Sequence, residues 1–269
     1  NGAVLTAGDD SVCVYDMETF EVLRTIQNHS DTILSCSSYG DFVLSGGMDF
    51  QLLVSSLSEG IQLHKLHGTN SFFTSNQTWV SQVECTEHYA FAGYNNGELF
   101  CWDTVDWQLK RKFVLPHAPE VTALMAWPLS TPLCSPADAS YLVKHRYHLA
   151  IGSSDGSLRR YDITSGEYIF QISLHPGTHI SPEPHPVVAL CVANVTGTDG
   201  SAKDQPLLLG ATSQGWGCFA LTTGRQLYYE SGGLSHCCAG LQGNHAFVCD
   251  SQSAAVRIVS MDTVVEYWL

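Results

Sequence analysis

The sequence predicts an all-β fold built from six consecutive repeats of short antiparallel strands. Six segments share one order: a short apolar run, a turn of small residues, an alternating run, a polar turn and a third run. The runs are rich in Val, Leu, Ile, Phe, Tyr and Cys, while Gly, Asp, Asn and Ser gather between them, which is typical of strands and tight turns. No apolar stripe with the 3.6-residue helical period extends over ten or more residues.

A constant spacing supports the alignment of the six units. Seven residues separate a turn residue from the end of the next strand, in the pairs Asp9 and Asp16, Asp49 and Ser56, Asn96 and Asp103, Asp155 and Asp162, Gln214 and Leu221, and Ser253 and Ser260. The units therefore recur at intervals of 40, 47, 59, 59 and 39 residues. A further strand-like run precedes five of them. A base period near 40 with insertions predicts one four-stranded sheet per unit.

Single four-stranded sheets cannot bury both of their faces, so the units are expected to stack as the blades of a β-propeller. The first unit begins in its second strand, and the last is expected to run through a fourth strand at 264–269. The prediction is one domain over 1–269 with five full blades and three further strands. It would lack an upstream strand or blade and would belong to a ring of six or seven blades.

The residues that end the third strands connect the chain to a known family. The segment SSDGSLRRYDITSGE at 153–167 resembles the second turn, third strand and following turn of the WD-repeat β-propellers. The signature dipeptide occurs as Trp102-Asp103, and in softened form as Tyr15-Asp16 and Tyr161-Asp162. The other three units carry Ser55-Ser56, Ala220-Leu221 and Val259-Ser260 there. The resemblance covers nearly the whole chain, through one strong unit, two moderate units and three that match mainly by register.

This resemblance implies a structural role for certain histidines. In the family, a His before the first strand of a blade binds the Asp of the turn between the second and third strands. His29 would then serve Asp49, and His117 would serve Asp155. Because a buried carboxylate needs hydrogen-bond donors, the assignment is also physically sound. A catalytic interpretation of these pairs would need a nearby Ser nucleophile.

Composition restricts the possible partners. The chain has 12 Lys and Arg against 26 Asp and Glu, a net charge of −14, which disfavours nucleic acid and anionic membranes and favours protein partners, including basic ones. No apolar stretch approaches the ~20 residues of a membrane helix. The ten cysteines lie mostly within strand-like runs, which indicates an intracellular location in cytoplasm or nucleus. Three N-x-[ST] sequons, at Asn28, Asn76 and Asn194, point toward secretion instead.

Insertions beyond the basic repeat are candidate partner-binding loops, since a rigid scaffold carries function on its loops. They lie at 68–78, 128–146, 175–186 and 196–205. The Pro-rich insertion holds His175, His179 and His185, which could form a zinc site, but its stiff, Pro-rich sequence favours a rigid surface loop instead. Such a loop could also dock a partner. Lys144 and Arg146 could form a small basic spot. His236-Cys237-Cys238 lacks a C-x-x-C pair and predicts no metal site.

The expected function is a non-catalytic scaffold or adaptor that binds other proteins as a subunit of a complex. An alternative is a reader of a basic or modified peptide at the propeller channel mouth. A propeller hydrolase is a third, less favoured possibility, because no nucleophile elbow, H-E-x-x-H motif or phosphate-binding loop is present. No cofactor is expected.

Overall fold

A computed structural model describes residues 3–68, 78–128, 146–174, 185–195, 205–231, 240–242, 245–250 and 255–260. These residues contain strands and turns and no helix, which confirms the all-β prediction. The chain divides into two compact units, Asn1–Val121 and Thr122–Leu269, and each is described by itself.

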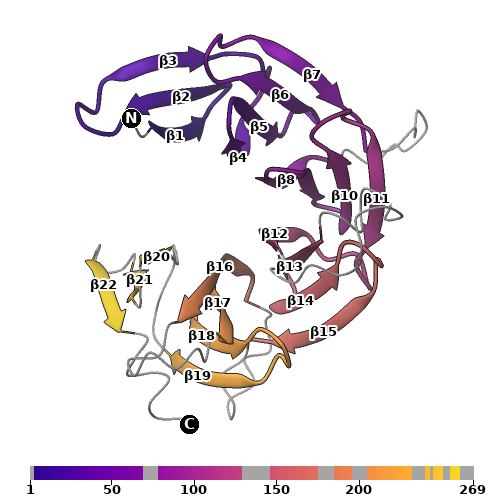
Figure 1. The fold of residues 1–269 in the computed structure, drawn as a ribbon, viewed down its shortest axis with the longest axis vertical. Helices are drawn as coiled ribbons and strands as arrows, with labels where there is room; N and C mark the ends of the chain where they lie inside the picture. Colours follow the sequence, from indigo (N-terminus) through magenta and orange to yellow (C-terminus); the bar gives the residue numbers. More distant parts are fainter. Residues whose placement is uncertain are drawn as a thin grey trace, which may run out of the picture. The chain divides into compact units, whose positions relative to one another are not determined.

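The described strands form six antiparallel sheets, each built from strands that are consecutive in sequence (Figure 1). The first three sheets are β1 (Ala3–Gly8), β2 (Ser11–Asp16) and β3 (Val22–Ile26); β4 (Ile33–Tyr39), β5 (Phe42–Gly47), β6 (Leu52–Ser56) and β7 (Gln62–Leu66); and β8 (Val80–Cys85), β9 (Tyr89–Tyr94), β10 (Glu98–Asp103) and β11 (Leu109–Val114).

The other three sheets belong to the second unit, apart from the first residue of β12. They are β12 (Val121–Pro128), β13 (Tyr147–Ser153), β14 (Ser157–Asp162) and β15 (Tyr168–Ser173); β16 (Val187–Val195), β17 (Gln205–Thr212), β18 (Gly215–Ala220) and β19 (Gln226–Ser231); and β20 (Gly240–Gln242), β21 (His245–Asp250) and β22 (Ala255–Ser260).

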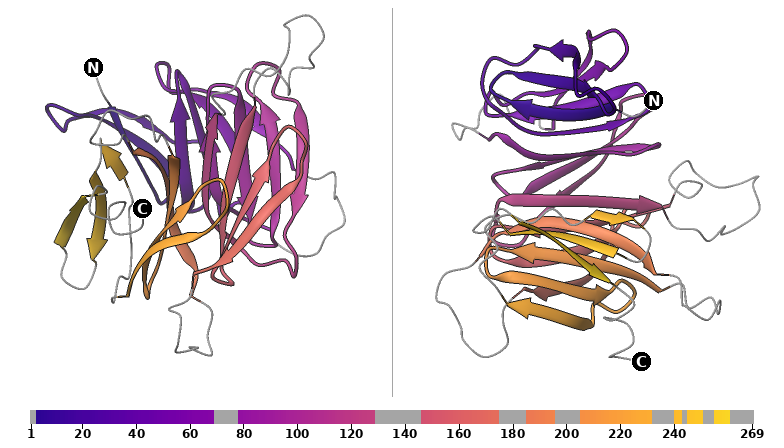
Figure 2. Two further views of the ribbon diagram at one scale, coloured as in Figure 1. Left: turned by 60° about the horizontal axis from the view of Figure 1, so that its bottom comes forward. Right: turned by 90° about the vertical axis from the view of Figure 1, so that its left-hand side faces the viewer.

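The blade pattern predicted from the repeats is confirmed. Among the described residues, four sheets have four strands, and the first sheet has three, which match the second, third and fourth strands of the pattern. The last sheet shows three strands among the described residues, and its expected fourth strand at 264–269 lies outside them. Within each unit, successive sheets lie face to face (Figures 1 and 2).

The turn between the third and fourth strands recurs in five sheets with the same hydrogen bonds. The last residue of the third strand donates its N–H to the carbonyl five residues on, at Asp16, Ser56, Asp103, Asp162 and Ala220. The fifth turn residue has a positive φ and is Phe20, Gly60, Trp107, Gly166 or Gly224. The side chain of Asp16, Ser56, Asp103 or Asp162 accepts backbone N–H groups of its own turn, as Asp and Ser commonly do.

One predicted register is wrong by a single residue. The fifth unit was aligned on Gln214 and Leu221, whereas the structure places Ala220 at the end of β18. The turn before β18 consists of Ser213 and Gln214, because Thr212 pairs directly with Gly215, and Ser213 rather than Gln214 lies seven residues before Ala220. The corresponding turn between β5 and β6 is longer.

Glycines on the second strands determine how closely the sheets approach. A Cβ on Gly46, Gly93 or Gly152 would lie 2.3, 2.3 or 2.6 Å from a Cγ1 of Val80, Val121 or Val187. Each valine is the first residue of the next sheet's first strand. Because any side chain would collide with the valine, glycine is required there for close packing.

Two hydroxyls reinforce this packing. Ser81 Oγ donates to the carbonyl of Val121 over 2.6 Å, and Thr122 Oγ1 donates to the carbonyl of Val187 over 2.6 Å. Apolar side chains fill the space between sheets in the first unit, including Leu44, Val54 and Trp102. A second cluster, with Leu158, Leu208 and Phe219, fills it in the second unit. The sheets thus bury one another, as the repeat pattern predicts.

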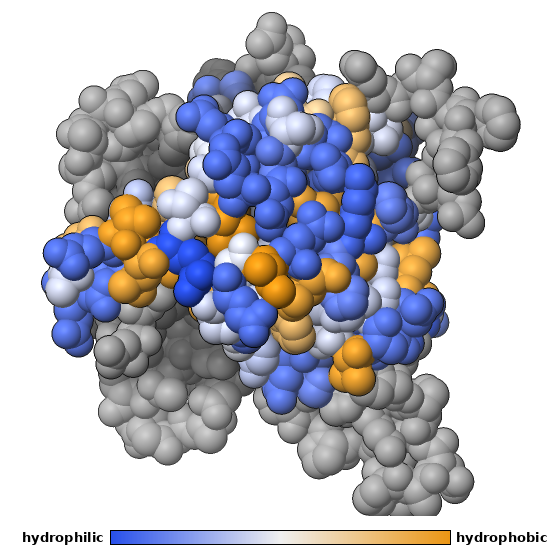
Figure 3. All heavy atoms as spheres, turned by 90° about the horizontal axis from the view of Figure 1, so that it is seen from above, coloured by the Kyte–Doolittle hydropathy of each residue, from blue (hydrophilic) through white to orange (hydrophobic). Residues whose placement is uncertain are grey.

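In the first five sheets, the last strand is the exposed edge. Apolar side chains there include Val22 and Leu23 on β3, and Ile61 and Leu63 at β7. Seen from the side of β3 and β7, small hydrophobic patches alternate with hydrophilic residues (Figure 3). Scattered groups of this kind are normal on a soluble surface and do not by themselves mark a site.

Candidate functional site

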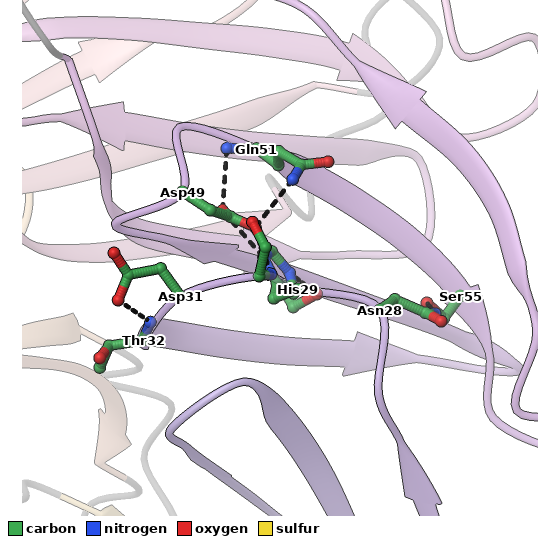
Figure 4. A network of polar contacts seen from close by, with 9 residues as sticks. Asn28, His29, Asp31, Thr32, Asp49, Gln51 and Ser55 are labelled. Atoms are coloured by element: carbon green, nitrogen blue, oxygen red, sulfur yellow. Dashed lines mark hydrogen bonds and ion pairs between the residues drawn. The ribbon is translucent and has the colours of Figure 1, made fainter.

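A buried polar network lies at the loop end of the second sheet, where β3 leads into β4 and β5 turns into β6 (Figure 4). His29 Nδ1 lies 3.0 and 2.9 Å from the two carboxylate oxygens of Asp49, and its Nε2 lies 2.8 Å from Ser45 Oγ. The contact between His29 and Asp49 implied by the family resemblance is therefore present. With the hydrogen on Nδ1 facing the carboxylate, Nε2 accepts the Ser45 hydroxyl.

Asp49 is saturated with donors. It also accepts the backbone N–H groups of Ser30 and Gln51, each over 3.1 Å, and the side-chain amide of Gln51 over 2.9 Å. Burial alone would raise the pKa of Asp49, but the hydrogen bonds from His29, Ser30 and Gln51 outweigh it and hold the pKa below its usual value. The carboxylate is thus a permanent acceptor that joins the two loops.

The Ser45, His29 and Asp49 side chains have the residue types and order of contacts of a hydrolase triad. Ser45 is only 3% exposed, and the His29 and Asp49 side chains are 1% and 2% exposed. Ser45 Oγ belongs to the middle of a paired strand, where a substrate carbonyl cannot reach it. The three groups therefore fasten the loop between β3 and β4 to the turn between β5 and β6.

A surface hollow of about 430 Å³ adjoins this network. It is lined by Ser30, Asp31, Met48, Asp49, Phe50 and Trp79. Met48 and Phe50 are 41% and 47% exposed, and Asp31 is also exposed. Trp79 is positioned by its indole N–H, which donates to Glu120 over 3.3 Å. Sequence reasoning missed this hollow, although the sequence does show Phe50 in a turn where two other units have Gly97 and Gly156.

The fourth sheet holds its turn carboxylate differently from the prediction. His117 was expected to serve Asp155, but His117 is exposed on the loop after β11. Asp155 is bound within its own sheet by Arg159 Nη2 over 2.8 Å and by Ser153 and Ser157. Burial would raise the pKa of Asp155, but these hydrogen bonds, that of Arg159 first, lower it to about 2. Arg159, which is 2% exposed, therefore donates to Asp155 in the place expected for His117.

Arg160 forms a second buried group in the same sheet. Arg159 and Arg160 are consecutive residues of β14, so their side chains lie on opposite faces of the sheet, and both are buried. Arg160 Nε donates to His148 Nδ1 over 2.8 Å, and its Nη1 donates to the carbonyl of Leu221, directly after β18 of the fifth sheet. The guanidinium also lies over the rings of Trp127 and Phe170, 5.6 and 5.7 Å from their centroids. Arg160 therefore links two neighbouring sheets.

The remaining turn residues cap their strands. Asn96 Oδ1 accepts the N–H of Glu98 over 3.1 Å, and Asp103 accepts the N–H of Val105 over 2.7 Å. Trp102 is buried in the core of the first unit. Tyr161 is buried with its ring 5.7 Å from that of Tyr168. These side chains stabilise turns and cores, and none of them faces the hollow.

The residues predicted for partner-binding loops are only partly described. Lys144, His175 and His179 lie outside the described residues. Arg146 Nη2 contacts Asp162 Oδ2 over 2.9 Å, so its charge is directed toward the turn that ends β14. His185 Nδ1 lies 3.2 Å from Ser213 Oγ. The structure brings none of these described side chains to the hollow.

The described cysteines and the first sequon are engaged in the fold. The six cysteines whose side chains are described are free thiols, and burial raises the pKa of Cys85 and Cys218 to about 12, so that these two stay protonated. Asn28, the first sequon residue, is half-buried and donates from Nδ2 to Ser55 Oγ over 3.1 Å. Within the described part of the chain, no three His, Cys, Asp or Glu side chains are grouped as a metal site.

No helix among the described residues is long and apolar enough to cross a membrane. Comparison of the sequence with models of protein families and with curated proteins gives no match.

Proposed function

We propose that this protein is a non-catalytic binding platform of the WD-repeat type, which acts as an adaptor within an intracellular complex of several proteins. The observation that carries the proposal is the contrast between the two features at one end of the second sheet. The Ser45–His29–Asp49 network is buried and saturated, so it contributes rigidity. The adjoining hollow exposes Met48 and Phe50, which contribute a surface for recognition.

The family assignment within this proposal depends on the repeated turns. Trp102-Asp103 and the two Tyr-Asp pairs end third strands, and the following turns share one hydrogen-bond pattern. The contact between His29 and Asp49 fits the same family pattern. Protein recognition is the common use of such rigid loop-bearing scaffolds, so this step is an analogy of fold.

Purification of the tagged protein from its native cells, followed by size-exclusion chromatography and mass spectrometry, tests the proposal. We expect at least one protein to co-elute in fixed stoichiometry and to be retained by the Ser45→Ala variant. A protein that elutes alone would contradict the platform function. Turnover of an ester or peptide substrate that disappears in Ser45→Ala would instead support the hydrolase alternative.

A further inference from the structure

The turn that carries Phe50 has a backbone conformation that favours glycine. Phe50 has a φ of 64°, and Gly97 and Gly156 occupy the corresponding positions of the next two sheets with a φ of 75°. In all three turns, the preceding Asp or Asn side chain accepts the N–H of the residue that follows. An L-residue pays about 1–2 kcal/mol in this region, so the fold alone gives no reason for phenylalanine.

The Phe50 side chain is also poorly used in packing. It is 47% exposed, next to Met48 at 41%, and both line the hollow together with Trp79. The Trp79 ring is held in place by the hydrogen bond from its Nε1 to Glu120. Two exposed apolar side chains and one oriented indole around a concave surface are the elements of a recognition pocket.

The polar side of the hollow is negatively charged. Asp31 is exposed, its carboxylate is directed away from His29 (Figure 4), and its one hydrogen bond among the described contacts comes from the N–H of Thr32 over 2.7 Å. No described Lys or Arg forms an ion pair with Asp31, and none lines the hollow. Asp49 next to it is already saturated. The hollow thus combines aromatic faces with one carboxylate that has spare acceptor capacity.

The surrounding unit strengthens this preference for cations. Residues 1–121 contain fifteen Asp and Glu against five Lys and Arg, so they carry −10 of the chain's net charge of −14. Three of those five cations, Lys110, Arg111 and Lys112, are consecutive on β11. Such a field attracts cationic partners and repels anionic ones.

We propose that the hollow lined by Asp31, Met48, Phe50 and Trp79 binds a basic side chain, lysine or arginine, of a partner peptide that also carries apolar residues. The ammonium or guanidinium group pairs with Asp31 and lies against the Trp79 and Phe50 rings, while neighbouring apolar residues of the peptide cover Met48. The inference rests on the proposed platform function and names the chemistry of one partner segment.

Binding of a fluorescein-labelled short peptide with alternating arginine and leucine, measured by fluorescence anisotropy, tests this inference. The matched peptide carries citrulline in place of arginine and so loses only the charge. Two variants alter the hollow. Asp31→Asn keeps the acceptor for Thr32 while removing the charge, and Phe50→Gly removes the ring while relaxing the turn. Each is expected to weaken binding about 10-fold, equivalent to about 1.4 kcal/mol.

Matched controls are available at the opposite loop end of the first unit. Phe20→Gly removes another exposed aromatic with a positive φ, and Glu18→Gln removes another exposed carboxylate. Both are expected to bind the peptide as the unaltered protein does. Circular dichroism melting of all four variants establishes that each is folded.

Three results would overturn the inference. The first is no binding of the arginine peptide, and the second is equal binding of the arginine and citrulline peptides. The third is an affinity for the arginine peptide that falls equally with added salt in the unaltered protein and in every variant, which would indicate attraction to the acidic surface as a whole. If co-eluting proteins remain bound in Phe50→Gly and the peptide does not bind, the platform function stands and only this hollow loses its assignment. If no protein co-elutes and the peptide binds, the reverse holds.

Discussion

Arg160 donates from Nε to Nδ1 of His148 over 2.8 Å, so a buried cation in the fourth sheet is paired with an imidazole rather than with a carboxylate. This geometry requires His148 to be neutral, because a protonated Nδ1 could not accept the bond. Burial first, and then the positive charge of Arg160, lower the pKa of His148 to about 4, against a smaller opposing effect of Asp162.

The neutral state of His148 predicts a pH dependence of folding stability. The pKa of the His148 imidazole is 6.5 in the unfolded chain and about 4 in the folded protein. The unfolded state therefore binds the additional proton between these values, and the free energy of unfolding falls as the pH is lowered from 6.5 to 4. The steepest contribution is about 1.4 kcal/mol per pH unit.

Urea titrations at several pH values, on the unaltered protein and on His148→Asn, measure this contribution. The asparagine oxygen can accept the Arg160 bond and does not titrate, so the variant should show a shallower slope between pH 4 and 6.5. Identical slopes in the two proteins would show that His148 is not the group responsible.

Replacement of Asp155 by Ala is expected to destabilise the fold by about 1–3 kcal/mol. The reason is that Arg159, which is 2% exposed, would lose the carboxylate to which its Nη2 donates over 2.8 Å. Asp106→Ala is a suitable control, because its ion pair with Lys110 is at the surface and contributes little. Thermal melting should show a lower melting temperature for Asp155→Ala and little change for Asp106→Ala. An unchanged melting temperature for Asp155→Ala would refute the structural role of Asp155.

Gly93→Ala should destabilise the first unit by about 1–3 kcal/mol through overpacking. The added methyl would lie 2.3 Å from Val121 Cγ1 and 2.6 Å from its Cβ. Gly8→Ala provides the comparison, since a Cβ there meets no atom within 4 Å. Chemical denaturation should separate the two, and Val121→Ala should recover part of the loss in Gly93→Ala. Equal stability of both glycine variants would argue against the packing described.

The two aromatic residues at the fifth position of third-to-fourth strand turns should respond differently to glycine. Phe20 is 75% exposed, so Phe20→Gly relieves a φ of 57° and is expected to change the free energy of unfolding by less than about 1 kcal/mol. Trp107 contacts the rings of Phe42 and His64 at centroid distances of 5.1 and 5.3 Å. Trp107→Gly should therefore lose about 2–3 kcal/mol. Comparable losses in both variants would contradict this distinction.

The sequence was sufficient for the sheets because strand and turn chemistry recurs in every unit. It also led to the contact between His29 and Asp49, since both residues occupy recognisable positions. It could not lead to Arg159 as the donor to Asp155, because an arginine in a strand carries no signal of which neighbour it meets. The one-residue shift at Ala220 was missed because the next residue, Leu221, is also apolar and buried, so the apolar pattern does not show where β18 ends.

The hollow and the Arg160–His148 pair depend on contacts between segments that are distant in sequence. His148 and Arg160 belong to adjacent strands, but the carbonyl of Leu221 that Arg160 contacts lies in the turn after β18. Trp79, directly before β8, and Phe50, after β5, likewise line the hollow from segments that belong to different sheets. Neither arrangement has a fixed spacing that repeat analysis could detect.

At Gly46, Gly93 and Gly152, a valine of the next sheet packs against the glycine backbone, and this contact limits which parts of the chain can vary. Such a contact involves no charge and no hydrogen bond, so it is insensitive to protonation and to the identity of the turn residues. The fourth sheet binds its carboxylate through an arginine and the second through a histidine, yet both receive the next sheet at the equivalent glycine. Stacking is thereby separated from surface chemistry, and the loop ends can differ from blade to blade without altering the scaffold beneath them.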